Sequence, residues 1–290
     1  MKFGSVENPE EIDFALPMDH PGTKGALSKG GGGLQEAFVG CAKWNKQDLK
    51  GFYPRGTKDE LAYYSTQFNS IELNATFYNF YKEDQIQTWH DKVPEGFKFF
   101  PKVNQYISHV KRLNNVELPL EDFANTMRAF GDKLGMVFLQ VHNNFAPKNW
   151  ERLQNTLEFW PKDIPLALEL RHTDWYNDET VAEDLYALLD EHKVANIVTD
   201  TAGRRDLLHM RLTTPVAFVR YVGANHASDW TRLDDWIERI KAWQDQGLQK
   251  LYFFVHQNLE KESPLLSARF LENFNKTFGF DIKIPEPAKK

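Results

Sequence analysis

The sequence is poor in the features that mark secreted and membrane-spanning proteins. Its 290 residues contain one cysteine, Cys41, which excludes a disulfide framework within the chain and fits a reducing compartment. No apolar run approaches the roughly 20 residues that a membrane-spanning helix needs. The N-terminal sequence MKFGSVENPEEIDFALPMDH is too acidic and too interrupted for a signal peptide. We therefore expect a cytoplasmic protein with no membrane partner.

Excess positive charge is also missing. The net charge is −6 and the isoelectric point about 5.9, which argues against general binding of nucleic acid, although a local basic patch is compatible with these values. Lys24 and Lys29 lie in a glycine-rich stretch, but the pattern GxxxxGK(S/T) is not present. A Walker-type phosphate loop is therefore not supported, and we expect no cofactor.

The chain is 41% hydrophobic and long enough for one barrel-sized domain or two smaller ones. Residues 1–36 differ from the rest because they include the run Gly30 to Gly33. We expect them to form a flexible N-terminal extension that packs on the surface or covers a site as a mobile lid. Residues 281–290 are expected to form a loose C-terminal tail, which leaves 37–280 as the folded domain.

From Ala37 onward, short apolar runs alternate with amphipathic segments. Apolar strands separated by helices indicate a parallel sheet covered by helices, and eight such units predict an α/β fold, a single (β/α)8 TIM-type barrel. An open doubly wound sheet is the alternative, because residues 201–215 are short for a helical crossover. The expected strands cover 37–44, 70–78, 97–104, 136–142, 166 onward, 195–200, 216–223 and 250–258, and the expected helices 59–68, 83–93, 120–134, 150–160, 180–192, 233–246 and 263–278.

The stretch from Leu166 to Trp175, LALELRHTDW, is apolar at its start and charged at its end. Side chains alternate along a strand, so Glu169 and Arg171 share one face. A buried glutamate is costly unless it is paired, and Arg171 is the nearest candidate. In a TIM barrel the C-terminal ends of the strands carry the site. We expect one pocket there to be shared by Glu72, Lys102, Glu169, Arg171 and Arg220.

Two carboxylates and three cations suit an anionic substrate that arginine and lysine hold while a glutamate accepts a proton. Simpler interpretations remain open for each member: a rim ion pair for Glu169 with Arg171, and solvent contact for Lys102. A metal site is a rival, but no HxH or HExxH spacing supports it, and we predict no metal. Its ligands would be Glu72, His142, Glu169, Asp200 and His256.

Several motifs appear in an order that resembles the YecE-like family, a domain of unknown function whose members form TIM barrels. They are ELNATFY, FYP, ISH with KRL, KLG with LQ, ELRHTDW and the arginine of FVRYVG. The resemblance covers Ala37 to about Phe274 and implies the barrel but no activity. The chain departs from the pattern at His142, at Val222, where relatives carry a histidine, and at His256. The matched polar positions are Glu72, Asn74, Lys102, His109, Gln140, Glu169, Arg171, His172, Trp175 and Arg220.

The leading hypothesis is an enzyme that acts on a small anionic or phosphorylated substrate at the C-terminal mouth of the barrel. A barrel that binds or processes nucleic acid, with aromatic residues stacking on bases, is possible but not favoured. A metal-dependent hydrolase or isomerase and a non-catalytic ligand-binding protein also remain open. The expected catalytic residues are Glu72, Glu169 and Lys102, and the expected substrate-binding residues are Asn74, His109, Gln140, Arg171, His172, Trp175 and Arg220.

Overall fold

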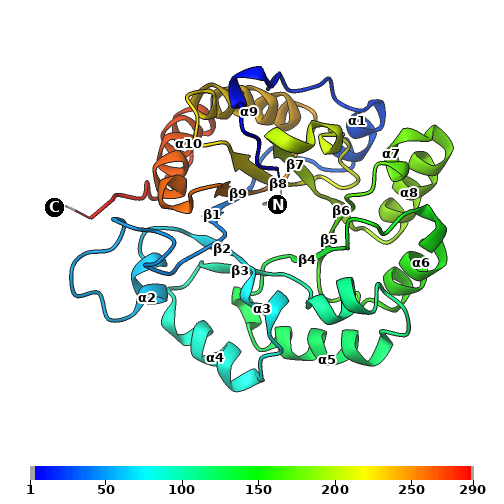
Figure 1. The fold of residues 1–290 in the computed structure, drawn as a ribbon, viewed down its shortest axis with the longest axis horizontal. Coiled ribbons are helices and arrows are strands. Elements are labelled where there is room, and N and C mark those ends of the chain that lie inside the picture. The colour runs from blue at the N-terminus through cyan, green and yellow to red at the C-terminus, as the bar shows by residue number, and fades with distance from the viewer. Residues whose placement is uncertain (1–3, 289–290) are drawn as a thin grey trace.

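A computed structural model describes residues 4–288, and its strands form parallel sheets surrounded by helices (Figure 1). Six strands pair in the order β3-β2-β1-β9-β8-β7 and three in the order β4-β5-β6. Every strand pairing is parallel. The strands are β1 (Glu36–Cys41), β2 (Ser70–Leu73), β3 (Lys98–Pro101), β4 (Val137–Gln140), β5 (Leu166–Glu169), β6 (Ala195–Asn196), β7 (Val198–Thr201), β8 (Val216–Gly223) and β9 (Lys250–Gln257).

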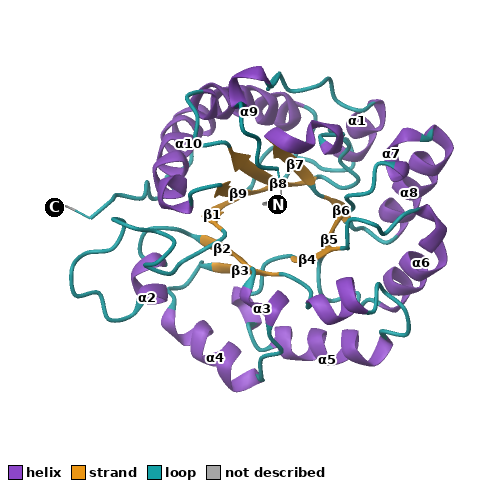
Figure 2. Cartoon of the chain, viewed as in Figure 1, coloured by secondary structure: helices purple, strands orange, loops and turns teal. Residues whose placement is uncertain are grey.

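The two sheets curve around a common centre, and the helices lie outside them (Figure 2). Where β3 approaches β4, two isolated parallel bridges join Phe99 to Leu134 and Lys102 to Phe138. On the other side, β6 and β7 follow one another along the chain with only Ile197 between them. The parallel, helix-covered arrangement is thus confirmed. The ladder is divided into sheets of six and three strands rather than running continuously through eight.

Caps mark the ends of some of the helices. Asp59 and Asp178 accept hydrogen bonds from the backbone N–H groups at the starts of α2 and α8, and Gly279 ends α10 in the left-handed conformation. None of the helices in residues 4–288 has the length and apolar character needed to cross a membrane. The helices are α1 (Pro21–Leu27), α2 (Glu60–Tyr64), α3 (Ala75–Tyr78), α4 (Glu83–Lys92), α5 (Glu117–Arg128), α6 (Trp150–Phe159), α7 (Asp174–Asn177), α8 (Glu179–Glu191), α9 (Ser228–Asp245) and α10 (Ser263–Phe278).

The expected strand over residues 70–78 is wrong in its second half. The strand ends at Leu73, and the helical turn α3 follows from Ala75. The hydroxyl of Thr76 donates a hydrogen bond to the carbonyl of Lys102 (2.8 Å), which ties this turn to the end of β3. The alternation of polar residues in this stretch predicted a strand. The structure has a helical turn there instead, because the turn is held by a contact with a distant segment of the chain.

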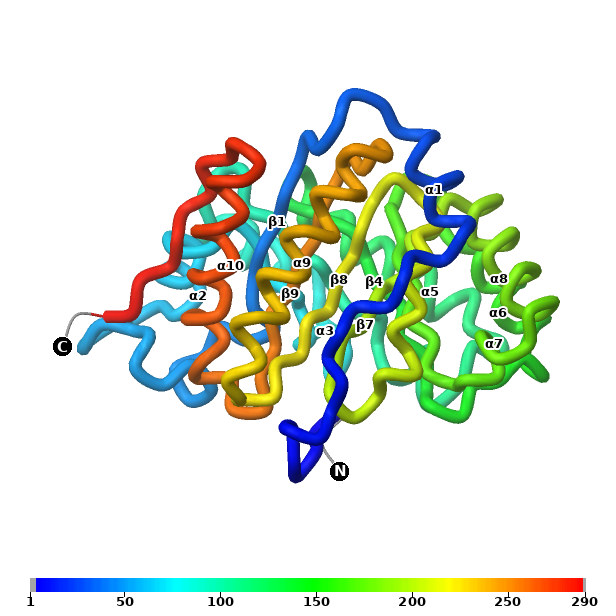
Figure 3. The backbone as a smooth tube through the Cα atoms, turned by 90° about the horizontal axis from the view of Figure 1, so that it is seen from above, coloured from blue at the N-terminus to red at the C-terminus, as the bar shows by residue number. Residues whose placement is uncertain are grey.

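Residues 4–36 run along the outside of the domain from the C-terminal end of β7 to the N-terminal end of β1 (Figure 3). At the first end, the backbone N–H of Gly203 donates to the carbonyl of Gly4 (3.0 Å). At the other end, the N–H of Gln35 donates to the carbonyl of Gln249 (2.8 Å). The segment thus brings Gly4 to the end of the domain where the C-terminal ends of the strands lie.

The C-terminal residues 281–288 also lie against the domain. The side-chain amide of Asn275 donates to the carbonyl of Ile282 (2.6 Å), and Ile282 and Ile284 pack against buried apolar residues. Further on, the N–H of Ala288 donates to the carbonyl of Phe52 (3.2 Å). This segment therefore joins the end of α10 to the loop before α2.

Aromatic side chains fill the space inside the ring of strands. The ring of Phe254 lies 4.9 Å from that of Phe100 and 5.2 Å from that of Phe218, centroid to centroid. These three residues and Phe138 are fully buried and belong to one cluster. The space inside the ring of strands is therefore a packed core. It forms a floor beneath any polar residue that follows on the same strand face.

Candidate functional site

Four strands carry a polar residue two positions after an inward-facing aromatic residue. Residues i and i+2 of a strand point to the same face, so these polar side chains lie directly above the aromatic floor, toward the C-terminal ends of the strands. Their position inside the ring follows from the strand register and does not depend on the loops. The pairs are Phe100 with Lys102, Phe138 with Gln140, Phe218 with Arg220 and Phe254 with His256.

Arg220 lies at the centre of this polar layer and joins two carboxylates. It donates from Nε and Nη2 to Glu72 (2.9 and 2.8 Å) and from Nη1 to Glu169 (2.5 Å). The other oxygen of Glu169 accepts a hydrogen bond from Nε of Arg171. All four side chains are largely buried. The structure therefore joins four of the five residues expected to share a pocket through one network of ion pairs.

The carboxylates of this network are held in the ionised form. Burial opposes ionisation of Glu72, but the charges of Arg220 and His256 keep its pKa well below the usual range. Burial acts in the same way on Glu169, and Arg171 and Arg220 lower its pKa to about 2. Both groups are therefore weak bases at neutral pH.

Two further side chains fix the orientation of Glu72. The amide of Asn74 donates to its Oε1 (2.8 Å), and Nε2 of His256 lies 2.9 Å from its Oε2. Together with the two bonds from Arg220, this gives the carboxylate four polar contacts. Saturation of its oxygens suits a supporting role for Glu72 better than direct contact with a substrate.

Lys102 completes the cluster from the end of β3. Its ammonium group donates to the amide oxygen of Gln140 (2.7 Å) and lies 4.1 Å from the ring centroid of Phe77. Burial, followed by the charges of Arg220 and Arg171, lowers the pKa of Lys102 to about 7. The amine is therefore divided between its charged and neutral forms near neutral pH.

A cavity of about 550 Å³ opens above this cluster. On its wall, the rings of His109 and His142 lie 5.4 Å apart, and burial together with the charge of Lys102 lowers the pKa of His109 to about 4. Arg204 donates to the carbonyl of Arg171 (2.8 Å), and Gly4 forms part of the rim. The polar residues that matter for chemistry in this cavity are Lys102, His109, Gln140, His142, Arg171 and Arg204.

Two of the residues expected to bind substrate, Trp175 and His172, do not line the cavity. Trp175 is fully buried in the core, where its indole N–H donates to the carbonyl of Phe145 (2.6 Å). His172 accepts a hydrogen bond from the N–H of Asp174 (3.3 Å) in the loop after β5. The strand β5 ends at Glu169, so His172 lies beyond it and outside the set of residues that line the cavity.

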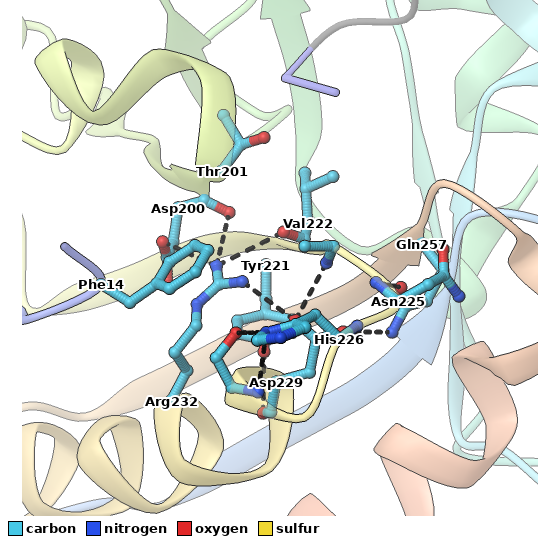
Figure 4. A network of polar contacts seen from close by, with 12 residues as sticks. Phe14, Asp200, Thr201, Tyr221, Val222, Asn225, His226, Asp229, Arg232 and Gln257 are labelled. Carbon is cyan, nitrogen blue, oxygen red and sulfur yellow. Dashed lines mark hydrogen bonds and ion pairs between the residues drawn. The ribbon is translucent and has the colours of Figure 1, made fainter. Parts of the chain in front are cut away.

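A second polar network lies beside the mouth, between β7, β8 and α9 (Figure 4). The buried guanidinium of Arg232 contacts Asp200 (2.8 Å) and Asp229 (3.2 Å). Its central carbon lies 4.4 Å from the ring centroid of Phe14 and 4.5 Å from that of Tyr221. Phe14 thus anchors the N-terminal segment on a buried cation, and we assign this network to structure.

Sequence reasoning considered His142 and His256 as ligands of the rival metal site but not as substrate-binding residues, and it did not consider Arg204. The repeated aromatic-x-polar pattern of the strands would have placed His256 inside the ring. His142 follows Gln140 just beyond β4, where strand alternation places both on one side. Arg204 lies in the turn Ala202–Leu207, and nothing in its sequence neighbourhood signals the cavity.

The metal-site rival required several histidines and carboxylates around one point. Within residues 4–288, no group of three His, Cys, Asp or Glu side chains is arranged to hold a metal ion. Of the five ligands considered, Asp200 belongs to the network of Arg232, whereas Glu72 and Glu169 bind Arg220. Arginine thus occupies the place between the carboxylates.

Comparisons with known proteins agree on one family. The family model described as "Protein of unknown function DUF72" matches residues 38–289. The UPF0759 protein YecE of Escherichia coli K12 is 22% identical over 83% of this chain and 93% of its own length, and the UPF0759 protein YunF of Bacillus subtilis 168 is 25% identical over 77% and 80%.

Solved structures show the same fold. A DUF72 family protein from Thermotoga maritima MSB8 superposes with a TM-score of 0.69 at 24% identity, over 82% of this chain and 98% of that one. Another, from Enterococcus faecalis V583, gives 0.67 at 19% identity, over 87% and 100%. The chain belongs to the DUF72 family of proteins of unknown function, which includes the YecE-like proteins.

Proposed function

We propose that the chain forms a single (β/α)8 barrel of the TIM type and is an enzyme that acts on a small anionic or phosphorylated substrate at its C-terminal mouth. One observation supports this most strongly: the buried cluster contains three cations and two carboxylates, and the cation in excess, Lys102, lies on the cavity wall. An anion in the cavity would balance this charge.

The pKa values favour a division of roles that differs from the one expected from sequence. Glu72 and Glu169 position Arg220 and Arg171, because carboxylates with such low pKa values are weak proton acceptors. Lys102, with a pKa of about 7, is matched to proton transfer at neutral pH. Gln140 orients its amine through the hydrogen bond to Oε1.

Calorimetric titration with inorganic phosphate tests the anion site. We expect the wild-type protein to bind phosphate and Lys102→Met to weaken binding by about tenfold or more, since hydrogen bonds to charged groups contribute about 1.5–3 kcal/mol. Lys98→Met is the matched control, because Lys98 begins the same strand at the opposite end and donates to the carbonyl of Asp132. Equal affinity in all three proteins, or no binding at all, would contradict the proposal.

One observation favours a second candidate, a barrel that binds single-stranded nucleic acid. Tyr78 borders the cavity and is 63% exposed, and the nearby Phe80 is 60% exposed, with its ring 6.2 Å from that of Tyr106. Exposed aromatic rings can stack on bases. Fluorescence anisotropy with a labelled oligothymidylate should then show binding that Tyr78→Ala weakens and that added phosphate reverses. An unchanged anisotropy would reject this candidate.

A further inference from the structure

Lys102 differs from an ordinary buried lysine in what surrounds its amine. Its neighbours are one neutral hydrogen-bond acceptor, Gln140, and an aromatic face, Phe77, and the amine borders the cavity of about 550 Å³. The nearby carboxylates Glu72 and Glu169 are bound to arginine. Among the described residues, these carboxylates thus form their ion pairs with arginine and not with the amine of Lys102.

Lys133 shows the contrast, because it is equally buried. Both residues are 7% exposed, but the ammonium of Lys133 donates to the backbone carbonyls of His90 and Val93, at 2.7 Å each. Lys133 also lies outside the set of residues that line the mouth cavity. Of these two buried lysines, Lys102 borders the cavity and Lys133 does not.

We propose that Lys102 is a nucleophile that forms an imine with a small anionic aldehyde or ketone, one that carries a carboxylate or phosphate group close to its carbonyl. This inference rests on the proposed anion site and names the class of substrate. Arg171 and Arg204 lie on the same cavity wall as Lys102 and are suited to hold the anionic group. The carbonyl carbon would then face the amine.

The reaction conserves atoms and needs no oxidant or reductant. The lone pair of the neutral amine attacks the carbonyl carbon, the C=O π bond opens, and a proton moves from nitrogen to oxygen to give a carbinolamine. Loss of water then forms the C=N bond, so that amine and carbonyl give imine and water. His142 lines the cavity and offers a ring nitrogen for these proton movements.

The charges around Lys102 favour the neutral amine that this step requires. Arg220 on β8 and Arg171 after β5 lower its pKa, whereas Glu169 on β5 and Glu72 on β2 raise it. His109 faces the amine from the π-helical turn Tyr106–Val110, and its own pKa of about 4 keeps it neutral near pH 7. Burial and the two arginines prevail, and they bring the pKa of Lys102 to about 7.

Reductive trapping tests the inference. The wild-type protein, Lys102→Met and Lys102→Arg are incubated with glyoxylate, or with pyruvate, and sodium cyanoborohydride near neutral pH, followed by intact-mass measurement and peptide mapping. We expect Lys102 to be modified about tenfold or more faster than Lys98, because burial and the nearby arginines lower the pKa of Lys102 to about 7. Neither variant should carry an adduct at position 102, and phosphate should slow the labelling of wild type.

Lys133 and Lys98 act as internal references within the same digest. Modification of Lys102 at the rate of either reference, or no modification with both probes, overturns the imine. Phosphate titration distinguishes the imine proposal from the anion-site proposal. Phosphate binding that depends on Lys102, without an adduct, would overturn the imine and leave the anion site. An adduct without phosphate binding would support Lys102 as a nucleophile and overturn the anion site. Lys102→Met leaves two arginines facing two carboxylates, so we expect this variant to fold.

Discussion

Arg220 binds Glu72 through two parallel hydrogen bonds, from Nε at 2.9 Å and from Nη2 at 2.8 Å. This two-point geometry is the strong form of an arginine–carboxylate pair, and here it joins β8 to β2 across the ring. The remaining nitrogen of Arg220 reaches Glu169 on β5. One side chain therefore connects three strands that are far apart in sequence.

Replacement of Glu169 tests what this network contributes to stability. In Glu169→Gln, the partners Arg171 and Arg220 lose a counter-charge in a buried site. We expect the free energy of unfolding to fall by on the order of 3 kcal/mol, because breaking a buried pair leaves charge uncompensated. Chemical denaturation monitored by tryptophan fluorescence measures the change.

The control for that experiment is Glu158→Gln. Glu158 is exposed on α6 and accepts a hydrogen bond from Gln154 (2.9 Å), so its replacement should alter stability by less than about 0.5 kcal/mol. If Glu169→Gln is as stable as wild type or more stable, the carboxylate is kept for chemistry, and the supporting role assigned to it is wrong.

The anchoring of the N-terminal segment gives a second prediction. Phe14→Ala removes the ring that covers the guanidinium of Arg232 at 4.4 Å. We expect a loss of about 1–2 kcal/mol, from the cation–π contact and the apolar area of the ring. Met18 lies in the same segment and is 89% exposed, so Met18→Ala is the matched control and should leave the melting temperature unchanged. Equal melting curves for both variants would show that Phe14 does not anchor the segment.

Sequence reasoning succeeded where a segment is long and its partners are local. The strand at Val216–Gly223 and the helix at Ser263–Phe278 have the expected bounds, because an unbroken apolar run and a regular helical period define them. The stretch Ala75–Tyr78 failed because its turn depends on the contact of Thr76 with the distant Lys102. A single sequence contains no signal for such a contact.

The candidate site was predictable in part for a similar reason. Alternation along a strand placed Glu169 and Arg171 on one face, and the hydrogen bond between their side chains agrees. The central position of Arg220 was not predictable, because it depends on which strands lie opposite one another across the ring. Arg204 comes from the 3-10 turn Ala202–Leu207 and Gly4 from the start of the described chain, and only the folded chain brings both to the cavity.

The third prediction concerns the cost of placing Lys102 in the interior. Its pKa in the folded protein is about 7, below its usual 10.5, so the unfolded chain binds the proton more tightly between these values. The buried ammonium therefore lowers stability in full below about pH 7, and this cost disappears as the pH rises toward about 10.5. The groups that set this balance are Arg220, Arg171, Glu169 and Glu72.

The substitution Lys102→Met removes the ammonium group and, with it, the loss of stability caused by burying that charge. We expect the variant to be more stable than wild type by on the order of a few kcal/mol near pH 6, and the advantage to shrink steadily as the pH approaches about 10. Urea denaturation of both proteins at each pH measures their free energies of unfolding. Groups that titrate in both proteins affect both values equally, so their effect cancels in the difference between the two free energies. Lys98→Met, at the other end of β3, should show no comparable trend. A stability difference for Lys102→Met that stays constant from neutral to alkaline pH would mean that the amine titrates like an ordinary lysine, and both the proton-transfer role and the imine would lose their chemical basis.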